Sequence, residues 1–459
     1  NISNIANYFI ILIFKAVMSA RSLNKNQNEQ VSGGGSVKRQ RIAVIGAGVS
    51  GIVAAHYLSR RHDVVLFEAE DRLGGHTNTI DVGPDFGSDA GLPVDTGFIV
   101  YNERTYPHLI QFFKELGIEG SPTDMTFSFS DPSRNFAYAG SGLNGLLAYR
   151  RQAFDPGFWA FLASVFRFNR RASRDLQGGG IADITLEAYL DQIKAPQRLR
   201  RDYLSPMIQA IWSSPGTEAI ACPAESFIRF FANHGLLSRP GSVKWRYLKG
   251  GSRRYIQAFQ DRFPGEIRVQ TPVSSVARRP EGPLVRFPGG EETFQAVVLA
   301  AHADQTLAVL EDPDEREQAA LAPWRYSRNR TVLHCDVSHM PPRPRAWACW
   351  NILRHPEDAD DRPVRVTYWM NSLQRLEAVR NWLVSLNPGT DFSPGSWAYE
   401  TVYEHPVYSL ESMAAQRLLP ELSGRRQTYF CGSYHGYGFH EDGARSGVEV
   451  ARQHFGVQV

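Results

Sequence analysis

The chain of 459 residues is 42% hydrophobic and 21% charged, which is ordinary for a folded enzyme of two domains or of one interrupted domain. Its formal net charge of +3 is close to neutral and its basic residues are dispersed, so we expect no nucleic-acid partner. The four cysteines form no C-x-x-C pair, so the sequence indicates neither a metal site nor a disulfide framework, and we expect a reducing, cytoplasmic location.

Residues 1–37 are expected to precede the folded part. The apolar run from Tyr8 to Phe14 has seven residues, whereas a bilayer-spanning helix needs about 20. The run also lacks the basic start and the small-residue cleavage site of a signal peptide. Because Met18 resembles a natural start, we interpret residues 1–17 as upstream sequence, with a membrane anchor as the alternative. The polar, glycine-rich residues that follow predict a disordered leader up to residue 37.

Residues 41–68 have the pattern of a dinucleotide-binding strand-helix-strand unit, with G-x-G-x-x-G between the first strand and the helix. Gly46 allows the tight turn, Gly48 lets the backbone approach a pyrophosphate, and Gly51 lets the helix pack close to the strand. The start of the helix adds free N–H groups and a positive dipole end. Glu68 ends the second strand, where its carboxylate can accept hydrogen bonds from an adenosine ribose.

Helical periodicity takes over from residue 127 to residue 225. An aromatic run over residues 158–168 is followed there by three arginines, Arg170, Arg171 and Arg174. A basic, aromatic helix of this kind could rest on a membrane surface. The alternative is a helix that faces the core of a substrate domain, with its arginines simply solvated.

The later segments are predicted to alternate between two domains. Residues 296–301 form a fully apolar strand of the kind found in buried parallel sheets. Strands with alternating polarity follow, such as residues 331–335, and indicate a second excursion into the substrate domain. We therefore expect a cofactor-binding domain of residues 38–126, 226–305 and 411–459, and a substrate domain of the helical residues 127–225 and the sheet residues 306–410.

A second motif lies near the C-terminus, between Thr428 and Gly447. A short strand ends at Gly432, a loop follows, and Asp442-Gly443-Ala444 opens a last helix that runs to about residue 454. The start of such a helix presents free N–H groups and the positive end of its dipole, which suits a negatively charged edge of a ligand. The motif therefore predicts a contact between this helix and the cofactor.

Both motifs resemble those of the flavin-containing amine oxidase superfamily. In that superfamily an acid, a short spacer and a Gly-Gly pair follow the first fingerprint, as residues 68–76 do here, and a motif like residues 428–447 closes the chain. The resemblance covers residues 40–456. It implies an α/β fold in which an α+β substrate domain interrupts a Rossmann-like FAD-binding domain of the glutathione-reductase-like type. It also implies FAD, bound non-covalently, since Cys431 lies inside a strand as a core residue.

Within the superfamily, the chain is most similar to a branch of predicted NAD/FAD-binding oxidoreductases. Members of this branch occur beside cyclopropane-fatty-acid synthases or are fused to them. The stretches Gly-Gly-His and Tyr-Gly-Phe-His-Glu-Asp-Gly carry this similarity. The resemblance places Val273 at the adenine. The cofactor-binding residues that it implies are Gly46, Gly48, Gly51, Glu68, Arg72, Gly74, Gly75, Val273, Gly432, Asp442, Gly443 and Ala444.

The chain departs from the amine-oxidising members of the superfamily at two places. Those enzymes hold a lysine close to flavin N5, and this chain has no lysine after Lys249. They also place a pair of aromatic side chains in front of the flavin, and the position near the end of the chain is taken here by His440. Both departures weaken the case for amine oxidation.

The lipid branch implies an acyl-chain substrate and desaturation, saturation or double-bond isomerisation, each of which needs a proton carrier near the reacting carbon. We expect His440 in this role, with Tyr437 and Tyr434 as orienting or proton-donating neighbours. These residues lie in the loop before the last helix, and histidine titrates near neutral pH. The alternative is that His440 binds only the loop backbone and that the tyrosines pack. Trp212 and Tyr101 are weaker candidates for pocket walls, with core packing as the alternative.

Three functions therefore remain open. The first is an FAD-dependent oxidoreductase or isomerase of acyl lipids, and the second is an oxidase of amines or amino acids. The third is an FAD-stabilised scaffold for a lipid-modifying methyltransferase of the cyclopropane-fatty-acid-synthase kind. The expected partners are a lipid or small-molecule substrate, this methyltransferase and the surface of a membrane.

Overall fold

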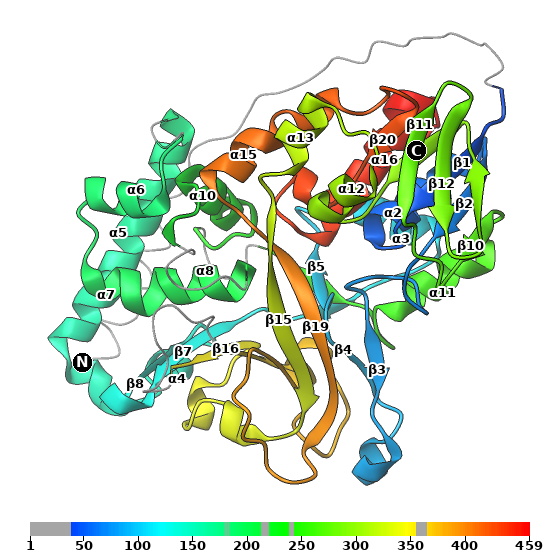
Figure 1. Ribbon diagram of the computed structural model, residues 1–459. Helices are drawn as coiled ribbons and strands as arrows, with labels where there is room; N and C mark the ends of the chain where they lie inside the picture. Colours follow the sequence, from blue (N-terminus) through cyan, green and yellow to red (C-terminus); the bar gives the residue numbers. More distant parts are fainter. Residues whose placement is uncertain (1–37, 180, 182, 213–219, 238–242, 355–364) are drawn as a thin grey trace. The chain divides into compact units, whose positions relative to one another are not determined.

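A five-stranded parallel sheet forms the centre of the cofactor-binding part (Figure 1). The computed structural model describes residues 38–179, 181, 183–212, 220–237, 243–354 and 365–459, so the expectations for residues 1–37 lie outside the described residues. Every neighbouring pair of strands runs parallel. The order is β10 (Glu266–Arg268), β2 (Asp63–Phe67), β1 (Arg41–Ile45), β14 (Ala296–Leu299) and β20 (Thr428–Phe430).

Both faces of this sheet are covered, and its strands are therefore apolar almost throughout. Ile42 and Val44 pack in one cluster with α2, α3, α11 and α16. Ala43 and Ile45 pack in another, with two strands of a small antiparallel sheet. This arrangement confirms the predicted α/β fold with a Rossmann-like domain. The bounds are α2 (Val49–Leu58), α3 (Pro107–Glu115), α11 (Arg253–Arg262), α16 (His440–Phe455), β11 (Ser275–Arg279), β12 (Gly282–Phe287) and β13 (Gly290–Thr293).

The substrate part is built on a mixed sheet in the order β19-β15-β18-β17-β16-β7-β8. β16 and β7 pair in parallel, and the other neighbours pair antiparallel. β15 and β19 are long and run side by side (Figure 1). The bounds are β7 (Phe127–Asp131), β8 (Phe136–Ala139), β15 (Arg325–His334), β16 (Trp350–Leu353), β17 (Val366–Trp369), β18 (Leu383–Leu386) and β19 (Trp397–Val407).

The helices of the substrate part gather together, at the left of Figure 1. They do not occupy quite the expected residues. Residues 127–139 were expected to be helical but form β7 and β8, because Phe127 and Phe129 alternate with serines at the period of a strand. α10 crosses the expected boundary at residue 225, because its apolar face packs on α5 and α6. The bounds are α5 (Pro156–Gly178), α6 (Leu186–Gln192), α7 (Gln197–Leu199), α8 (Ser205–Trp212) and α10 (Ala224–Asn233).

Shorter elements connect the two parts. None of the helices in the described ranges combines the length and the apolar character that are needed to cross a membrane. The remaining bounds are β3 (Thr79–Asp81), β4 (Pro93–Asp95), β5 (Val100–Asn102), β6 (Ser121–Thr123), β9 (Trp245–Tyr247), α4 (Leu143–Leu146), α12 (Ala303–Val309), α13 (Glu315–Leu321), α14 (Met370–Leu373) and α15 (Leu410–Gln416).

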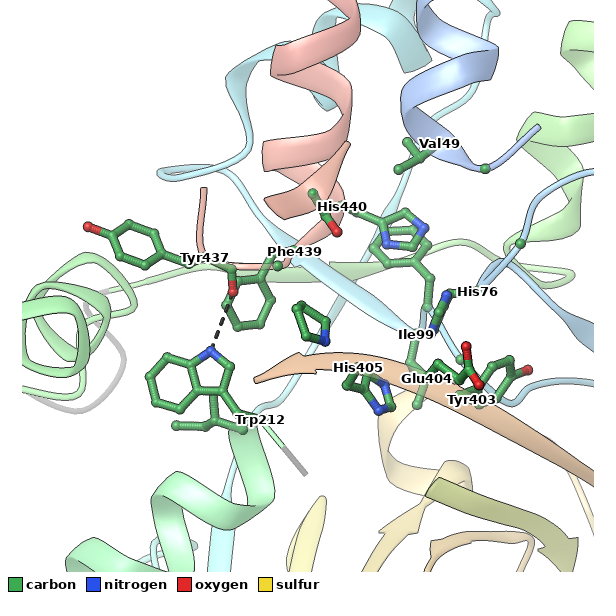
Figure 2. A pocket seen from close by; sticks show the side chains of 18 of the residues that line it. Val49, His76, Ile99, Trp212, Tyr403, Glu404, His405, Tyr437, Phe439 and His440 are labelled. Carbon is green, nitrogen blue, oxygen red and sulfur yellow. Dashed lines mark hydrogen bonds between the residues drawn. The ribbon is translucent and has the colours of Figure 1, made fainter. Parts of the chain in front are cut away.

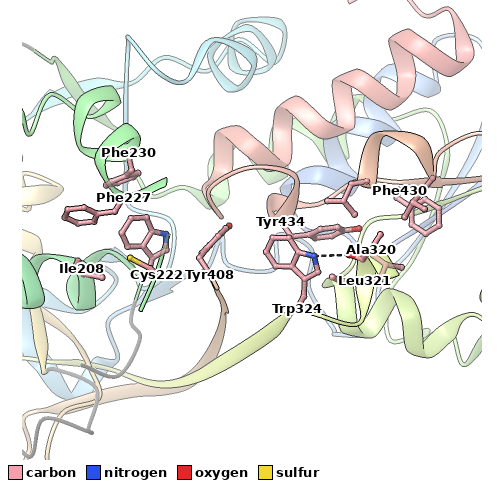
Figure 3. Packing of buried hydrophobic residues seen from close by; sticks show 14 of the residues in the cluster. Ile208, Cys222, Phe227, Phe230, Ala320, Leu321, Trp324, Tyr408, Phe430 and Tyr434 are labelled. Atoms are coloured by element: carbon pink, nitrogen blue, oxygen red, sulfur yellow. Dashed lines mark hydrogen bonds between the residues drawn. The ribbon is translucent and has the colours of Figure 1, made fainter. Parts of the chain in front are cut away.

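A row of buried aromatic side chains joins the two parts into one core. Figure 3 shows Phe227 and Phe230 of α10 at one end, Trp324 and Tyr434 at the other, and Tyr408 between them. The rings of Trp324 and Tyr408 meet edge to face, with centroids 5.7 Å apart. The helices of the substrate part are thereby fixed against the cofactor sheet.

Helices α2 and α16 approach each other closely because small residues line their contact. A Cβ atom on Gly443 would lie 2.7 Å from Cγ1 of Val49. A Cβ atom on Gly447, one turn further along, would lie 2.5 Å from the carbonyl oxygen of Ser50 and 2.9 Å from the backbone nitrogen of Ala54. Backbone atoms cannot turn aside as side chains do, so Gly447 sets the distance between the helices.

We expect Gly447→Ala to lower the free energy of unfolding by about 1–3 kcal/mol, because the added methyl group forces α16 away from α2. The matched control is Gly178→Ala, also in a helix, where a Cβ atom would meet no atom within 4 Å. This control should be as stable as the parent chain or slightly more stable. Denaturant unfolding of both variants is the measurement, and equal stability would contradict the close-packing account.

Candidate active site

Three glycines shape the turn between β1 and α2. Gly46 has a φ of +100°, which side chains disfavour. A Cβ atom on Gly51 would overlap the carbonyl oxygen of Gly46, so only glycine lets α2 begin against this turn. A Cβ atom on Gly48 would meet no atom within 4 Å, and Gly48 lines a cavity. The backbone of Gly48 is therefore open to a ligand.

A second turn without side chains, Gly74-Gly75, faces the first. Both glycines have positive φ, +114° and +55°, and a Cβ atom on Gly75 would lie 3.4 Å from Cα of Gly48. The N–H of Gly74 donates to the carbonyl oxygen of Ala47 at 2.8 Å. The two turns form one cradle of bare backbone at the start of α2, where N–H groups and the helix dipole favour a phosphate.

Glu68 ends β2 beside this cradle. Its Oε2 accepts a hydrogen bond from the N–H of Ala47 at 2.8 Å, and its Oε1 accepts one from the N–H of Glu70 at 3.0 Å. Arg72 pairs with Glu70 at 3.3 Å and donates to the carbonyl oxygen of Thr77 at 3.2 Å. Both Glu68 and Arg72 line the cavity, at the end where the sequence placed them.

One continuous cavity of about 1290 Å³ runs from the cradle into the substrate part. A pocket for one drug-sized ligand measures roughly 300–1,000 Å³, so this cavity has room for a dinucleotide and a substrate together. Val273 lines the cofactor end, where the adenine contact is predicted. Phe161, Leu162, Val165 and Met207 line the far end, which is mainly apolar.

Only some of the cofactor-binding residues predicted in the C-terminal motif line the cavity. Gly432 lines the cavity, whereas Asp442, Gly443 and Ala444 are not among its lining residues. Asp442 holds the preceding loop instead, because it accepts hydrogen bonds from the N–H groups of Tyr437 at 2.9 Å and Phe439 at 3.1 Å. Burial raises the pKa of Asp442 to about 6. The direct cofactor contact of these three residues stays a prediction.

Glu441 has a role that its position in the sequence did not reveal. Its carboxylate accepts hydrogen bonds from the N–H groups of His108 at 3.1 Å and Leu109 at 3.0 Å, and it pairs with Nδ1 of His108 at 2.7 Å. These N–H groups belong to the first turn of α3, so Glu441 caps α3 and not its own helix. The contact ties α3 to the loop that carries His440.

His440 stands at the first position of α16 and lines the cavity (Figure 2). Its ring stacks on Phe98 with a centroid distance of 3.8 Å and an interplanar angle of 12°. Its Nε2 lies 3.0 Å from Oγ1 of Thr77, which lies 2.6 Å from the hydroxyl of Tyr255. Burial lowers the pKa of His440 to about 3. The premise that His440 titrates near neutral pH is therefore wrong for this fold, and the ring is neutral at pH 7.

The same hydrogen bonds favour one position for the proton on the neutral His440 ring. Thr77 is the hydrogen-bond partner of the Tyr255 hydroxyl within the described residues. If Tyr255 donates to Thr77 and Thr77 donates to Nε2 of His440, all three side chains are satisfied. In this arrangement Nε2 accepts, so we expect the ring proton on Nδ1. Nδ1 makes no hydrogen bond with a described residue, so it can donate to a molecule in the cavity.

Four more histidines line the cavity, and the sequence analysis did not select them: His76, His234, His302 and His405. Figure 2 labels His76 and His405. The ring of His76 lies 5.2 Å from that of His405 and 6.3 Å from that of His302, between centroids, and stacks on Tyr403. Burial, reinforced by the neighbouring histidines, lowers the pKa of His76 well below its usual value and that of His405 to about 4. His76 directly follows Gly75, which is the signal that could have identified it.

Of the remaining candidates, Tyr434, Tyr437 and Trp212 line the cavity and Tyr101 does not. Tyr434 is buried among core aromatics and its ring meets Trp324, although it also reaches the cavity wall. The ring of Tyr437 points away from His440 in Figure 2. Trp212 lines the cavity and its Nε1 donates to the carbonyl oxygen of Tyr437 at 3.4 Å. Tyr101 is buried and is not among the lining residues.

The comparisons with known proteins agree with this fold and site. The family described as flavin containing amine oxidoreductase matches residues 49–348, and the chain belongs to this family. It is therefore a flavoprotein of the oxidoreductase class with FAD as its cofactor. What it oxidises or reduces does not follow from the family alone.

Two curated relatives and one solved structure are similar to the chain. The chain is 24% identical over 288 residues to the putative flavin-containing monoamine oxidase AofH of Mycobacterium tuberculosis. It is 27% identical over 275 residues to the flavin-dependent L-tryptophan oxidase RebO of Lentzea aerocolonigenes. These matches span 59% and 55% of both chains, so the chain covers less than two thirds of the relatives' length. The fold is similar to that of a CLA-producing fatty acid isomerase from P. acnes, with a TM-score of 0.64, 14% identity, and coverage of 91% of this chain and 99% of that one.

The residues present fit FAD. The cradle of Gly48 and Gly75 offers bare backbone to the phosphates, and Glu68 stands where a ribose would lie. Nε2 of His76 is buried and has no hydrogen-bond partner within the described residues, so it can bind a polar atom of a molecule in the cavity. Cys431 is fully buried, in agreement with non-covalent binding.

We expect Gly48→Val to yield folded but colourless protein. Gly48 has φ −70° and ψ 179°, which valine adopts without strain, and the new side chain would enter the phosphate cradle. Gly83→Val is the matched control, because Gly83 has φ −66° and ψ 163°, also meets no atom within 4 Å, and does not line the cavity. The ratio of flavin to protein absorbance is the measurement. Full flavin content in Gly48→Val would contradict the cofactor site.

We expect Thr77→Val to release the fixed proton position on His440, since both Nε2 of His440 and the Tyr255 hydroxyl lose their partner. Side-chain ¹⁵N NMR should show the Nδ1–H form in the parent protein and a mixture in the variant, with the His440 signal identified by its loss in His440→Gln. Thr306→Val, which removes a buried hydroxyl outside this network, should leave the signal unchanged. An Nε2–H form in the parent protein would overturn the assignment.

Proposed function

We propose that this protein is an FAD-dependent oxidoreductase that moves a hydride to or from an acyl chain, in desaturation, saturation or double-bond isomerisation. The observation that carries the proposal is the far end of the cavity. There the wall is formed by Phe161, Leu162 and Val165 of α5, Met207 of α8 and Leu386 of β18. An acyl chain would bury its methylene groups against this wall and gain about 0.8 kcal/mol for each one.

The carboxylates of the cavity argue against a cationic substrate. An ammonium group would need a carboxylate that is free to pair with it. Glu70 pairs with Arg72, and Asp124 pairs with Arg375 at 2.7 Å. Among the described lining residues, the other two carboxylates are also engaged: Glu68 binds backbone N–H groups, and Glu404 lies 3.8 Å from His302 and 3.7 Å from Arg328.

The residues around the reacting carbon would act as neutral groups. FAD, when bound, supplies the atom that accepts or donates the hydride. His440 would hold a polar atom in place through its Nδ1–H, with Thr77 and Tyr255 fixing the ring behind it. Phe439 stacks on Phe230 with ring centroids 4.8 Å apart, and this aromatic pair and Trp212 line the cavity, where they would exclude water from a bound substrate.

Oxidation of an amine or amino acid is the second candidate. It is favoured by the family match and by the oxidases among the relatives. A solved structure of similar fold, with 15% identity and a TM-score of 0.64, is a putrescine oxidase bound to putrescine. The acyl proposal draws on the fatty acid isomerase of similar fold in the same way. Association with a methyltransferase of the cyclopropane-fatty-acid-synthase kind, catalytic or as a scaffold, stays a prediction.

An anaerobic titration separates these functions. We expect unsaturated or saturated fatty acids and acyl phospholipids to bleach the oxidised-flavin absorbance band, or, if the reaction is an isomerisation, to yield a product of unchanged mass with a shifted double bond. A panel of amines and amino acids, including putrescine and tryptophan, is the parallel series. Bleaching by this panel alone would refute the acyl proposal, and no response to either series would favour the scaffold.

A further inference from the structure

The long helix α5 exposes aromatic side chains on one side. Phe158, Phe161 and Phe168 of this helix are buried, whereas Trp159 is 46% exposed and Phe166 is 51% exposed. Trp159 and Phe166 are seven residues apart and therefore lie on the same side of the helix. Phe154, just before α5, is 81% exposed. We call these three aromatic residues, together with the arginines described next, the α5 face.

Three arginines continue the same side of α5. Arg167, Arg170 and Arg174 are exposed, and none of them makes an ion pair or a hydrogen bond with another described residue. Arg171, which points further round the helix, differs because it pairs with Asp175 at 2.6 Å. The α5 face thus combines exposed aromatic rings with positive charges that no described carboxylate neutralises.

The inner side of the same helix forms part of the cavity wall. Phe161, Leu162 and Val165 line the cavity, and they alternate along α5 with the exposed Trp159 and Phe166. A helix with its side chains is about 10–12 Å thick. The α5 face and the apolar end of the cavity are therefore separated by the width of a single helix.

We propose that the α5 face docks on the surface of a bilayer that contains anionic lipids. Aromatic side chains on one side of a helix enter the boundary between headgroups and acyl chains, and arginines beside them bind lipid phosphates. The proposal rests on the proposed function for its purpose, since an acyl substrate resides in a membrane. The docking itself needs no turnover.

Charge complementarity favours a membrane over a protein as the occupant. An anionic surface satisfies three arginines that extend along two turns of helix without requiring a shaped partner. A protein would have to supply an acidic groove that matches both the rings and the charges. A protein partner is therefore an outcome of the test and not the proposal.

The test is sedimentation of the full-length, FAD-loaded chain with vesicles of phosphatidylcholine mixed with an equal amount of phosphatidylglycerol. We expect binding to this mixture to be at least about tenfold stronger than binding to phosphatidylcholine alone, and to weaken with salt. Two combined variants should each weaken it about tenfold: Trp159→Gln with Phe166→Gln, and Arg167→Gln with Arg170→Gln and Arg174→Gln. Arg171→Gln and Val379→Gln are the controls, the latter at an exposed valine outside α5, and both should bind as the parent does.

The results test membrane docking independently of the proposed acyl reaction. FAD content and circular dichroism of the variants show that the exposed substitutions leave the fold intact. Binding that the α5 variants do not weaken, or no binding by the parent chain, would overturn the docking proposal and leave the α5 face as a solvated surface or a protein site. Vesicle binding that depends on the α5 face, in a protein whose flavin no lipid bleaches and that shifts no double bond of a lipid, would support docking while refuting the acyl function.

Discussion

The approach of two backbone turns without side chains is the constraint on which the site depends. Gly48 and Gly75 lie so near each other that a Cβ atom on Gly75 would contact Cα of Gly48, at 3.4 Å. That approach requires α2 to begin directly at the end of β1, which Gly51 permits. It also fixes α16, because Gly443 and Gly447 seat that helix on α2. His440 is the first residue of α16, so its place in the cavity wall follows from the glycine contacts that seat this helix.

Burial decides the charge state of the cavity as much as residue identity does. The pKa of His440 falls to about 3 and that of His405 to about 4, mainly because burial penalises the charged ring. These histidines therefore enter the cavity at pH 7 as neutral hydrogen-bonding groups. A site of neutral histidines, with its carboxylates already engaged, disfavours a cationic substrate. The two ends of the cavity differ in chemistry, since bare backbone lines one end and apolar side chains line the other.

Much of the fold followed from local patterns, and what did not follow depended on distant contacts. The glycine turns, Glu68 and the first strand-helix-strand unit could be predicted because each depends on neighbours in the sequence. The part played by Glu441 could not, because the helix that it caps begins more than 300 residues earlier, at Pro107. His76 was quoted within a motif but was not selected, since only the fold brings His302 and His405 beside it. β7 and β8 were missed because two short alternating strands lie next to a long helical segment.

The two interpretations of the aromatic run over residues 158–168 turn out to be compatible. A run of this length covers three turns of helix, so its rings cannot all lie on one side. Phe158, Phe161 and Phe168 enter the core, and the residues between them, Trp159 and Phe166, are left in solvent. A helix that only packed would need no large apolar residues at those two positions, and lysine or glutamate would serve it better. Core packing on the inner side of α5 therefore leaves the outer side free for the docking that we propose.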